Sequence, residues 1–365
     1  MKNITQYVKD YNFSNFEENP LNPIDILIMA EISYFELKRY SNLFSTSKFE
    51  KLSLLNDKVI IKKIAKHTLD YKNNSPLFKL LFESLRFKDI EMAFYDSAFS
   101  SKDTMQYASM VFKLGNNYVI AYRGTDMSIL GWQEDLNLSY IDKLPSHQKG
   151  INYLKKTIDK LPKDADIFVT GHSKGGNFAT YSATNVPKKY QDRIKAIYDF
   201  DGPGYKSDIF IKPKFHNIEQ KYNKIIPYDS LVGMLLTDYK KYKVVKATGI
   251  NGIVQHSPFA WSISTDDFDY TPKVSKSSRA FDRALDEWVA GRDDKTKKQY
   301  TDAMFSFLNK CGIKDLSQLS GNVMPLFKKA ITQQKLIKRA SKKQAYSALF
   351  ELGALFLKYR FSRDI

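Results

Sequence analysis

Cysteine is almost absent from this sequence: Cys311 is the single one among 365 residues. One cysteine excludes an intramolecular disulfide and any zinc site built from several cysteines. No stretch reaches the roughly 18 uninterrupted apolar residues that mark a membrane span. Residues 1–20 lack the apolar core of a secretory signal. We therefore expect a soluble, cytoplasmic protein of a reducing compartment.

Positive charge is in excess and unevenly distributed. The formal net charge is +17, and residues 271–365 contain 20 Lys and Arg against 9 Asp and Glu. Between residues 316 and 350 there are seven basic residues and no acidic one. An AT-rich genome favours Lys codons, which can explain the excess of positive charge without any binding partner. For the basic C-terminal region, one interpretation is a basic face exposed only to solvent. The other is peripheral contact with an anionic membrane, since such a patch attracts polyanions. Nucleic acid is not expected as a partner, because no recognised binding motif is present.

The middle of the chain has the alternating pattern of an α/β protein. Residues 1–95 are mostly helical in pattern, with a helix start at Asn22-Pro23. Beyond them, short apolar runs alternate with amphipathic segments, which indicates a largely parallel sheet. The expected elements are hairpins over 109–124 and 243–258, strands over 166–171, 194–204 and 222–229, and helices over 150–161 and 177–186.

Helical patterning returns after a soft boundary at 272–278, where Pro272 and several serines supply turn chemistry. We therefore expect three parts. Residues 1–95 form a helical segment packed on the core, residues 96–275 form the α/β core, and residues 276–365 form a basic helical region.

The segment GHSKG, residues 171–175, follows an expected strand and opens an expected helix. A serine in such a tight turn projects its hydroxyl above the sheet edge, and Gly171 and Gly175 avoid clashes with the adjoining strand and helix. The helix beginning at Lys174 aims free N–H groups at the site, where they would stabilise an oxyanion. Ser173 is therefore the predicted nucleophile. The alternative is that the glycines only permit a tight turn. A phosphate-binding loop is disfavoured because its glycine spacings are absent.

A serine nucleophile needs a base and an acid. Among the five histidines, His256 follows the last expected strand, in agreement with the chain order Ser, acid, His. The acid should end a strand between Ser173 and His256. Asp229 is favoured, because an apolar run leads directly into it, and Asp199 and Asp201 are the alternatives. No metal or organic cofactor is expected, since the histidines and acids lack ligand spacing.

Several segments, in order and spacing, resemble fungal-type triacylglycerol lipases over about residues 105–262. YRGT (122–125) is similar to a strand end of that family, GHSKGG (171–176) to its nucleophile turn, DSLVGML (229–235) to its acid segment and HSPFAW (256–261) to its histidine segment. The resemblance implies an α/β-hydrolase-type, mostly parallel sheet with flanking helices. It also implies that Thr125 joins the Lys174 N–H in the oxyanion hole, and that 126–142 is a lid-like stretch.

Over nearly its whole length the chain is similar to a bacterial, lipase-like branch of these hydrolases, which brings no substrate with it. That similarity includes the Asn3 to Tyr7 element, the helix from Asn22 and LDEWVAG (285–291). Two positions differ from the fungal pattern. Lys174 stands where those lipases have Leu, which would place a cation at the mouth of the site. Asp201 stands where they have Gly, which keeps it open as the acid.

These residues together predict a serine ester hydrolase, lipase- or esterase-like, that acts on a small-molecule or lipid ester. Lys174 and the basic C-terminal region favour an anionic substrate or membrane. The alternative is a non-catalytic protein of the same fold that binds an anionic membrane or nucleic acid through its basic C-terminal region.

Overall fold

A computed structural model describes residues 1–365 except 67, 69, 238, 311–350, 352–353 and 363–365. Within these residues, nine strands form one sheet in which each strand pairs with the next along the chain. The pairings from β4 to β8 are parallel, and those at the two edges are antiparallel. The strands are β1 (Glu50–Lys51), β2 (Glu91–Ser100), β3 (Met105–Leu114), β4 (Asn117–Tyr122), β5 (Asp166–His172), β6 (Ile194–Phe200), β7 (Tyr222–Pro227), β8 (Lys243–Val245) and β9 (Tyr270–Thr271).

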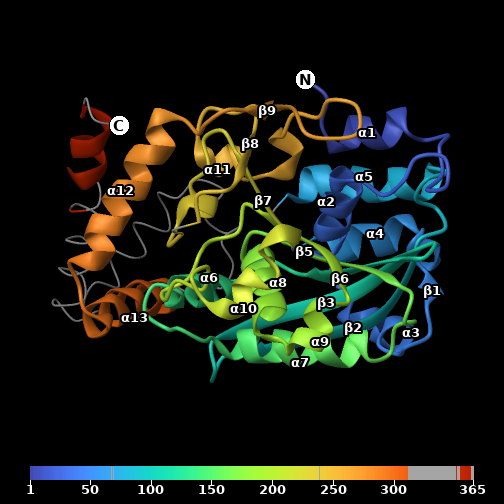
Figure 1. Ribbon diagram of the computed structural model, residues 1–365, viewed down its shortest axis with the longest axis horizontal. Coiled ribbons are helices and arrows are strands. Elements are labelled where there is room, and N and C mark those ends of the chain that lie inside the picture. The colour runs from blue at the N-terminus through green and yellow to red at the C-terminus, as the bar shows by residue number, and fades with distance from the viewer. Residues whose placement is uncertain (67, 69, 238, 311–350, 352–353, 363–365) are drawn as a thin grey trace.

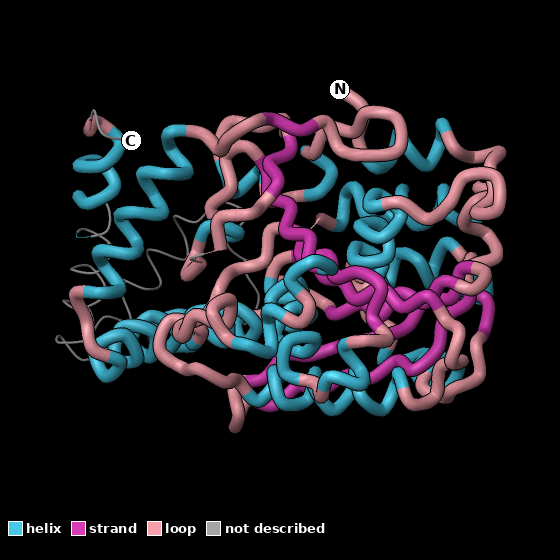
Figure 2. Tube along the Cα trace, viewed as in Figure 1, coloured by secondary structure: helices cyan, strands magenta, loops and turns pink. Residues whose placement is uncertain are grey.

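Helices cover both faces of the sheet, as the predicted α/β-hydrolase-type fold requires. Figure 1 shows α1, α2, α4 and α5 together on one side and α7 and α9 on the other, and Figure 2 shows the strands as one band between them. The helices are α1 (Ile4–Asp10), α2 (Pro23–Ile32), α3 (Ser41–Phe44), α4 (Lys58–Ala65), α5 (Tyr71–Glu83), α6 (Ile129–Asn137), α7 (Pro145–Ile158), α8 (Lys174–Asn185), α9 (Lys188–Gln191), α10 (Pro213–His216), α11 (Gly252–Gln255), α12 (Lys276–Ala290) and α13 (Asp294–Lys310).

Side-chain alternation along the strands divides the core into two halves. On β3, Ala108 and Met110 join the cluster beneath the N-terminal helices, whereas Tyr107 and Val111 join the cluster beneath α7 and α8. Successive side chains of a strand point to opposite faces, so a central strand with both faces covered is apolar throughout. The fold class predicted from the sequence is confirmed by this arrangement.

The first predicted hairpin is present and the second is not. Leu114 of β3 pairs with Asn117 of β4 across a two-residue turn in which Gly115 has φ +63°. The prediction for 243–258 is wrong, because only 243–245 is a strand of the sheet and the chain then enters α11. The reason is local: the Asn251 side chain accepts the N–H groups of Ile253 and Val254 and thereby caps a helix instead of forming a turn.

The predicted helix start at Asn22 is confirmed. Asn22 caps α2 by accepting two backbone N–H groups, and the Asp25 carboxylate accepts the backbone N–H of Asn22. Asp25 also receives a fully buried, two-pronged ion pair from Arg86, at 2.9 Å from Nε and 2.6 Å from Nη2. The pair joins the start of α2 to the loop that precedes β2.

Two helices of the C-terminal part, α12 and α13, lie at one end of the molecule (Figure 1). The basic stretch 316–350 and Cys311 lie outside the described residues, so their predicted roles remain predictions. None of the helices in the described ranges is long and apolar enough to cross a membrane. The division into three parts likewise stays a prediction.

We expect Arg86→Met to destabilise the fold by about 3–5 kcal/mol, because it leaves the Asp25 carboxylate buried without its cation. Urea denaturation followed by circular dichroism measures the change. The double variant Asp25→Asn with Arg86→Met should be more stable than Arg86→Met alone, since no uncompensated charge remains. Lys51→Met, which breaks the exposed pair with Asp89, is the control and should change little. Equal losses for the buried and exposed pairs would contradict the prediction.

Candidate active site

Ser173 lies in a strained turn between β5 and α8. Its backbone has φ +58° and ψ −134°, a conformation that a residue with a side chain rarely adopts. A Cβ on Gly171 would lie 2.1 Å from the carbonyl carbon of Gly175, and a Cβ on Gly175 would lie 2.1 Å from the carbonyl oxygen of Tyr122. Gly175 therefore lets the turn pack directly against β4, and Gly171 lets β5 pack against the start of α8, which is the geometry expected of a nucleophile turn.

His256 lies at the end of α11 and contacts an aspartate that follows β6. Its Nδ1 is 2.6 Å from Oδ2 of Asp201. Because a carboxylate only accepts, Nδ1 carries the proton and Nε2 is left to act as a base. Asp201 is fully buried and has φ +51°. It also accepts hydrogen bonds from Ser230 Oγ at 2.5 Å and from the Gly233 N–H at 3.0 Å.

The prediction that Asp229 orients His256 is wrong. The Asp229 carboxylate accepts a hydrogen bond from Ser275 Oγ, and its backbone N–H donates to Gln255 Oε1 at 2.8 Å. The physical reason lies in the sheet register. His172 of β5 is paired with Phe200 of β6, so the residue after each strand, Ser173 and Asp201, comes next to the other. The end of β7 is one strand farther from the serine.

The other alternative acid, Asp199, has a structural role. It accepts hydrogen bonds from Tyr222 Oη at 2.7 Å, Lys224 Nζ at 3.2 Å and the Gly202 N–H at 2.8 Å. These contacts fix the strand end that carries Asp201.

His172 supports His256 from within the protein. The two imidazole rings have centroids 4.5 Å apart, and His172 Nε2 donates to the His256 carbonyl oxygen at 2.9 Å. The Tyr34 hydroxyl completes the arrangement at 2.9 Å from His172 Nδ1. Burial, together with the neighbouring His256, holds the pKa of His172 well below its ordinary value. His172 is therefore neutral, and its contacts hold the His256 backbone in place.

No hydrogen bond joins Ser173 Oγ to His256 in the part of the chain that the structure describes. Contacts of this kind are commonly long before substrate binds. The structure thus brings the strand ends that carry Ser173 and Asp201 together and pairs Asp201 with His256.

The predicted oxyanion residues flank the turn. Lys174 is the first residue of α8, where a backbone N–H has no partner within the helix. Thr125 follows β4 and is buried, with its hydroxyl donating to Asp135 Oδ2 at 2.6 Å. That contact uses the hydroxyl proton, so the backbone N–H is the Thr125 donor that remains.

The expectation that Lys174 places a cation at the mouth of the site is wrong. Its side chain is 0% exposed, and its Nζ donates to Gln106 Oε1 and Glu134 Oε2, both at 2.9 Å. Asp135 lies 3.7 Å away. The carboxylates of α6 hold the ammonium inside the protein, because an unpaired buried charge would be far more costly. Lys174 therefore gives no support to an anionic substrate.

A cavity of about 210 Å³ adjoins the two histidines. The residues that line it include Glu31, Asp70 and Asn74 from the N-terminal segment and Trp132 from α6. Glu31 is 3% exposed, and its Oε1 lies 3.5 Å from His172 Nδ1 without a hydrogen bond. Burial, with Asp70 close by, raises the pKa of Glu31 to about 8. Nothing in the sequence pattern of α2 singled out this carboxyl group.

No group of three or more His, Cys, Asp and Glu residues suited to a metal ion occurs among the described residues. Near Ser173, Asp201 is paired with His256 and Asp199 with Lys224.

The fold is of the α/β-hydrolase type. The family model Mbeg1-like matches residues 81–306, and the chain belongs to the Mbeg1-like family. No curated protein matches the sequence.

Solved structures similar to this chain include three fungal proteins. A mutant of MDLA from Penicillium cyclopium is 16% identical with a TM-score of 0.40, covering 66% of this chain and 81% of that one. A lipase from Rhizopus microsporus var. chinensis is 13% identical with a TM-score of 0.39, covering 70% and 81%. Lipase II from Rhizopus niveus is 13% identical with a TM-score of 0.36, covering 67% and 94%.

We expect Glu31 to make the protein less stable as the pH rises from about 4.5 to 8. Its pKa is 4.5 in the unfolded chain and about 8 when folded. The folded state therefore holds a proton that the unfolded state has lost, and stability falls across this window. Glu31→Gln removes the effect, so its free energy of unfolding relative to wild type should increase by a few kcal/mol between pH 5 and 8.

Denaturant titrations of both proteins at several pH values measure this difference. His172 has the opposite influence, because its lowered pKa makes stability rise with pH, and it is present in both proteins. Parallel stability curves would show that Glu31 is ionised in the folded protein at neutral pH.

Proposed function

We propose that this protein is a serine ester hydrolase in which Ser173, His256 and Asp201 form the catalytic triad. The observation that carries the proposal is the 2.6 Å contact of His256 with Asp201, at a strand end next to a serine held in a strained turn. A nucleophile, a base and an orienting acid at neighbouring strand ends are what acyl transfer requires.

The proposed reaction uses these groups in order. His256 Nε2 takes the proton of Ser173 as the serine oxygen attacks the acyl carbonyl, and Asp201 stabilises the imidazolium that forms. The backbone N–H groups of Thr125 and Lys174 hold the oxyanion. His256 then gives its proton to the departing alcohol. A water molecule, activated by His256 in the same way, releases the acyl group from Ser173.

The N-terminal segment gives the proposed site a polar wall. Glu31 and Asp70 line the cavity beside His256, and a protonated Glu31 would offer a hydrogen bond there. A lipid or small-molecule ester whose alcohol group is polar suits this wall better than an ester whose alcohol group is purely apolar. The lid-like role of 126–142 is supported by Trp132 of α6, which lines the same cavity.

We expect a fluorophosphonate probe to label Ser173, because only an activated serine reacts readily with it. Mass spectrometry of the labelled peptide identifies the residue, and Ser173→Ala is the matched control. A folded protein that is not labelled would contradict the proposal and favour a non-catalytic binding protein of the same fold.

Asp201→Asn and Asp229→Asn distinguish the two acids. We expect Asp201→Asn to lower kcat on a 4-nitrophenyl ester by about 10⁴-fold, because the imidazole loses the partner that fixes its tautomer. Asp229→Asn should leave kcat close to that of the wild type, since its carboxylate contacts Ser275. The reverse order of effects would restore Asp229 as the acid and show that the His256 contact changes when substrate binds.

A further inference from the structure

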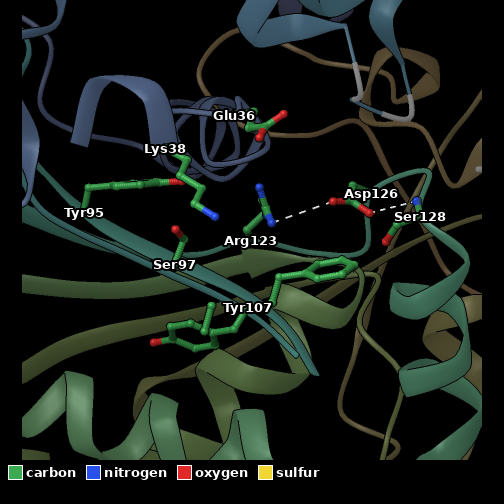
Figure 3. Close-up of a pocket in the computed structure, with 10 residues that line it drawn as sticks. Glu36, Lys38, Tyr95, Ser97, Tyr107, Arg123, Asp126 and Ser128 are labelled. Atoms are coloured by element: carbon green, nitrogen blue, oxygen red, sulfur yellow. Dashed lines mark hydrogen bonds and ion pairs between the residues drawn. The ribbon is translucent and has the colours of Figure 1, made fainter. Parts of the chain in front are cut away.

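A second cavity, of about 340 Å³, lies beside the end of β4. Lys38 from the segment after α2, Tyr95 and Ser97 from β2, and Arg123 and Asp126 from the end of β4 contribute to its lining (Figure 3). Its volume equals roughly eleven water molecules. It can therefore accept a group larger than a single ion.

Arg123 is a buried cation with almost no partners. The residue is 7% exposed, yet its guanidinium donates no hydrogen bond to any described residue, and its Nε is buried without a partner. The nearest carboxylate, Asp126, is 3.7 Å from Nη2, beyond hydrogen-bond distance, and accepts the Ser128 N–H at 2.9 Å instead. Buried donors are nearly always satisfied, and leaving those of a charged group unmade is costly.

Other donors face the same space. Figure 3 shows the Lys38 ammonium pointing toward the Arg123 guanidinium, with the Tyr95 and Ser97 hydroxyl groups beside Lys38, and Glu36 also lines the cavity. The Tyr95 hydroxyl is also buried without a hydrogen-bond partner. Two cations that face each other repel unless an anion lies between them. An anion between Lys38 and Arg123 would relieve this repulsion, and Glu36 and Asp126 are the carboxylates of the same lining.

We infer that this cavity binds a carboxylate or phosphate group through Arg123 and Lys38. The planar guanidinium matches the two oxygens of such a group, and Lys38 and Tyr95 supply donors from the other side. Arg123 is two residues before Thr125, so a bound anion would lie near the proposed oxyanion hole. The anion is either part of the ester substrate or a separate small molecule. Only the case in which the anion is part of the ester substrate rests on the proposed function.

Binding of inorganic phosphate tests the cavity without any need for catalysis. Calorimetric titration of the full-length protein, with ionic strength held constant by sodium chloride, compares wild type with Arg123→Gln and Lys38→Gln. We expect binding to weaken roughly tenfold or more in Arg123→Gln, the usual loss for a charge-assisted hydrogen bond, and to weaken in Lys38→Gln as well.

Lys62→Gln is the matched control, because Lys62 is an exposed lysine of α4 that does not line the cavity. It should bind phosphate as the wild type does. Lys38 is exposed too, so Lys38→Gln keeps the test valid even where Arg123→Gln fails to fold. No binding to the wild type, or equal binding to all four proteins, would overturn the inference.

A pair of esters identifies the source of the anion. The 4-nitrophenyl esters of pentanoate and of glutarate have the same chain length, and only the glutarate ester ends in a carboxylate. If Arg123→Gln lowers kcat/KM for the glutarate ester alone, the anion belongs to the substrate. Equal effects on both esters, together with phosphate binding that depends on Arg123, assign the cavity to a separate anion. Absence of Ser173 labelling would remove the proposed function but leave the phosphate result intact.

Discussion

The close contact between the Ser173 turn and β4 is the constraint on which the rest of the site depends. Gly175 lies so near the Tyr122 carbonyl that a single added carbon would meet it at 2.1 Å. The contact fixes α8 against the sheet, and it also brings the residues after Tyr122 to the start of that helix. Thr125 and the first N–H groups of α8 therefore come to the same place. A looser turn would separate the nucleophile from its proposed oxyanion donors, whatever the identity of the acid.

Buried charges hold the surrounding elements to this framework. Lys174 ties the first turn of α8 to Glu134 of α6, so the helix that follows Thr125 is anchored by the residue that follows the serine. Each such pair has given up the hydration of both partners, which makes it a poor source of net stability. The pair instead fixes the positions of the two helices, because the loss of either partner would leave the other charge buried without a partner. The segment from Thr125 through α6 is consequently fixed toward the end of α6 by Lys174.

Local pattern was sufficient to predict the strand, the serine turn, its glycines and His256. All of these are readable from a few neighbouring residues. The aspartate that contacts His256 was not, because Asp201 and Asp229 both follow a strand, and only the register of β5 against β6 distinguishes them. Lys174 was misread for a similar reason: its partners Gln106 and Glu134 are distant in sequence. The second hairpin failed because Asn251 followed by glycine suits both a turn and a helix cap. Long-range pairing decided the first two of these cases, and a local helix cap decided the third.

The segment 31–38 gives the site two different polar walls. Glu31 and Tyr34 line the cavity beside His256, and Lys38 lines the cavity beside Arg123. Between them, the Tyr34 hydroxyl reaches His172 and lies where any side chain at Gly124 would have to be. One short stretch, from the last turn of α2 to Lys38, therefore sets the carboxyl-lined wall on one side of the β4 end and the cationic wall on the other. The α/β core supplies the residues of the proposed chemistry, and many proteins of this fold class share such a core. The N-terminal helical segment supplies the polarity, and so it is the part of this chain in which selectivity for a substrate would reside.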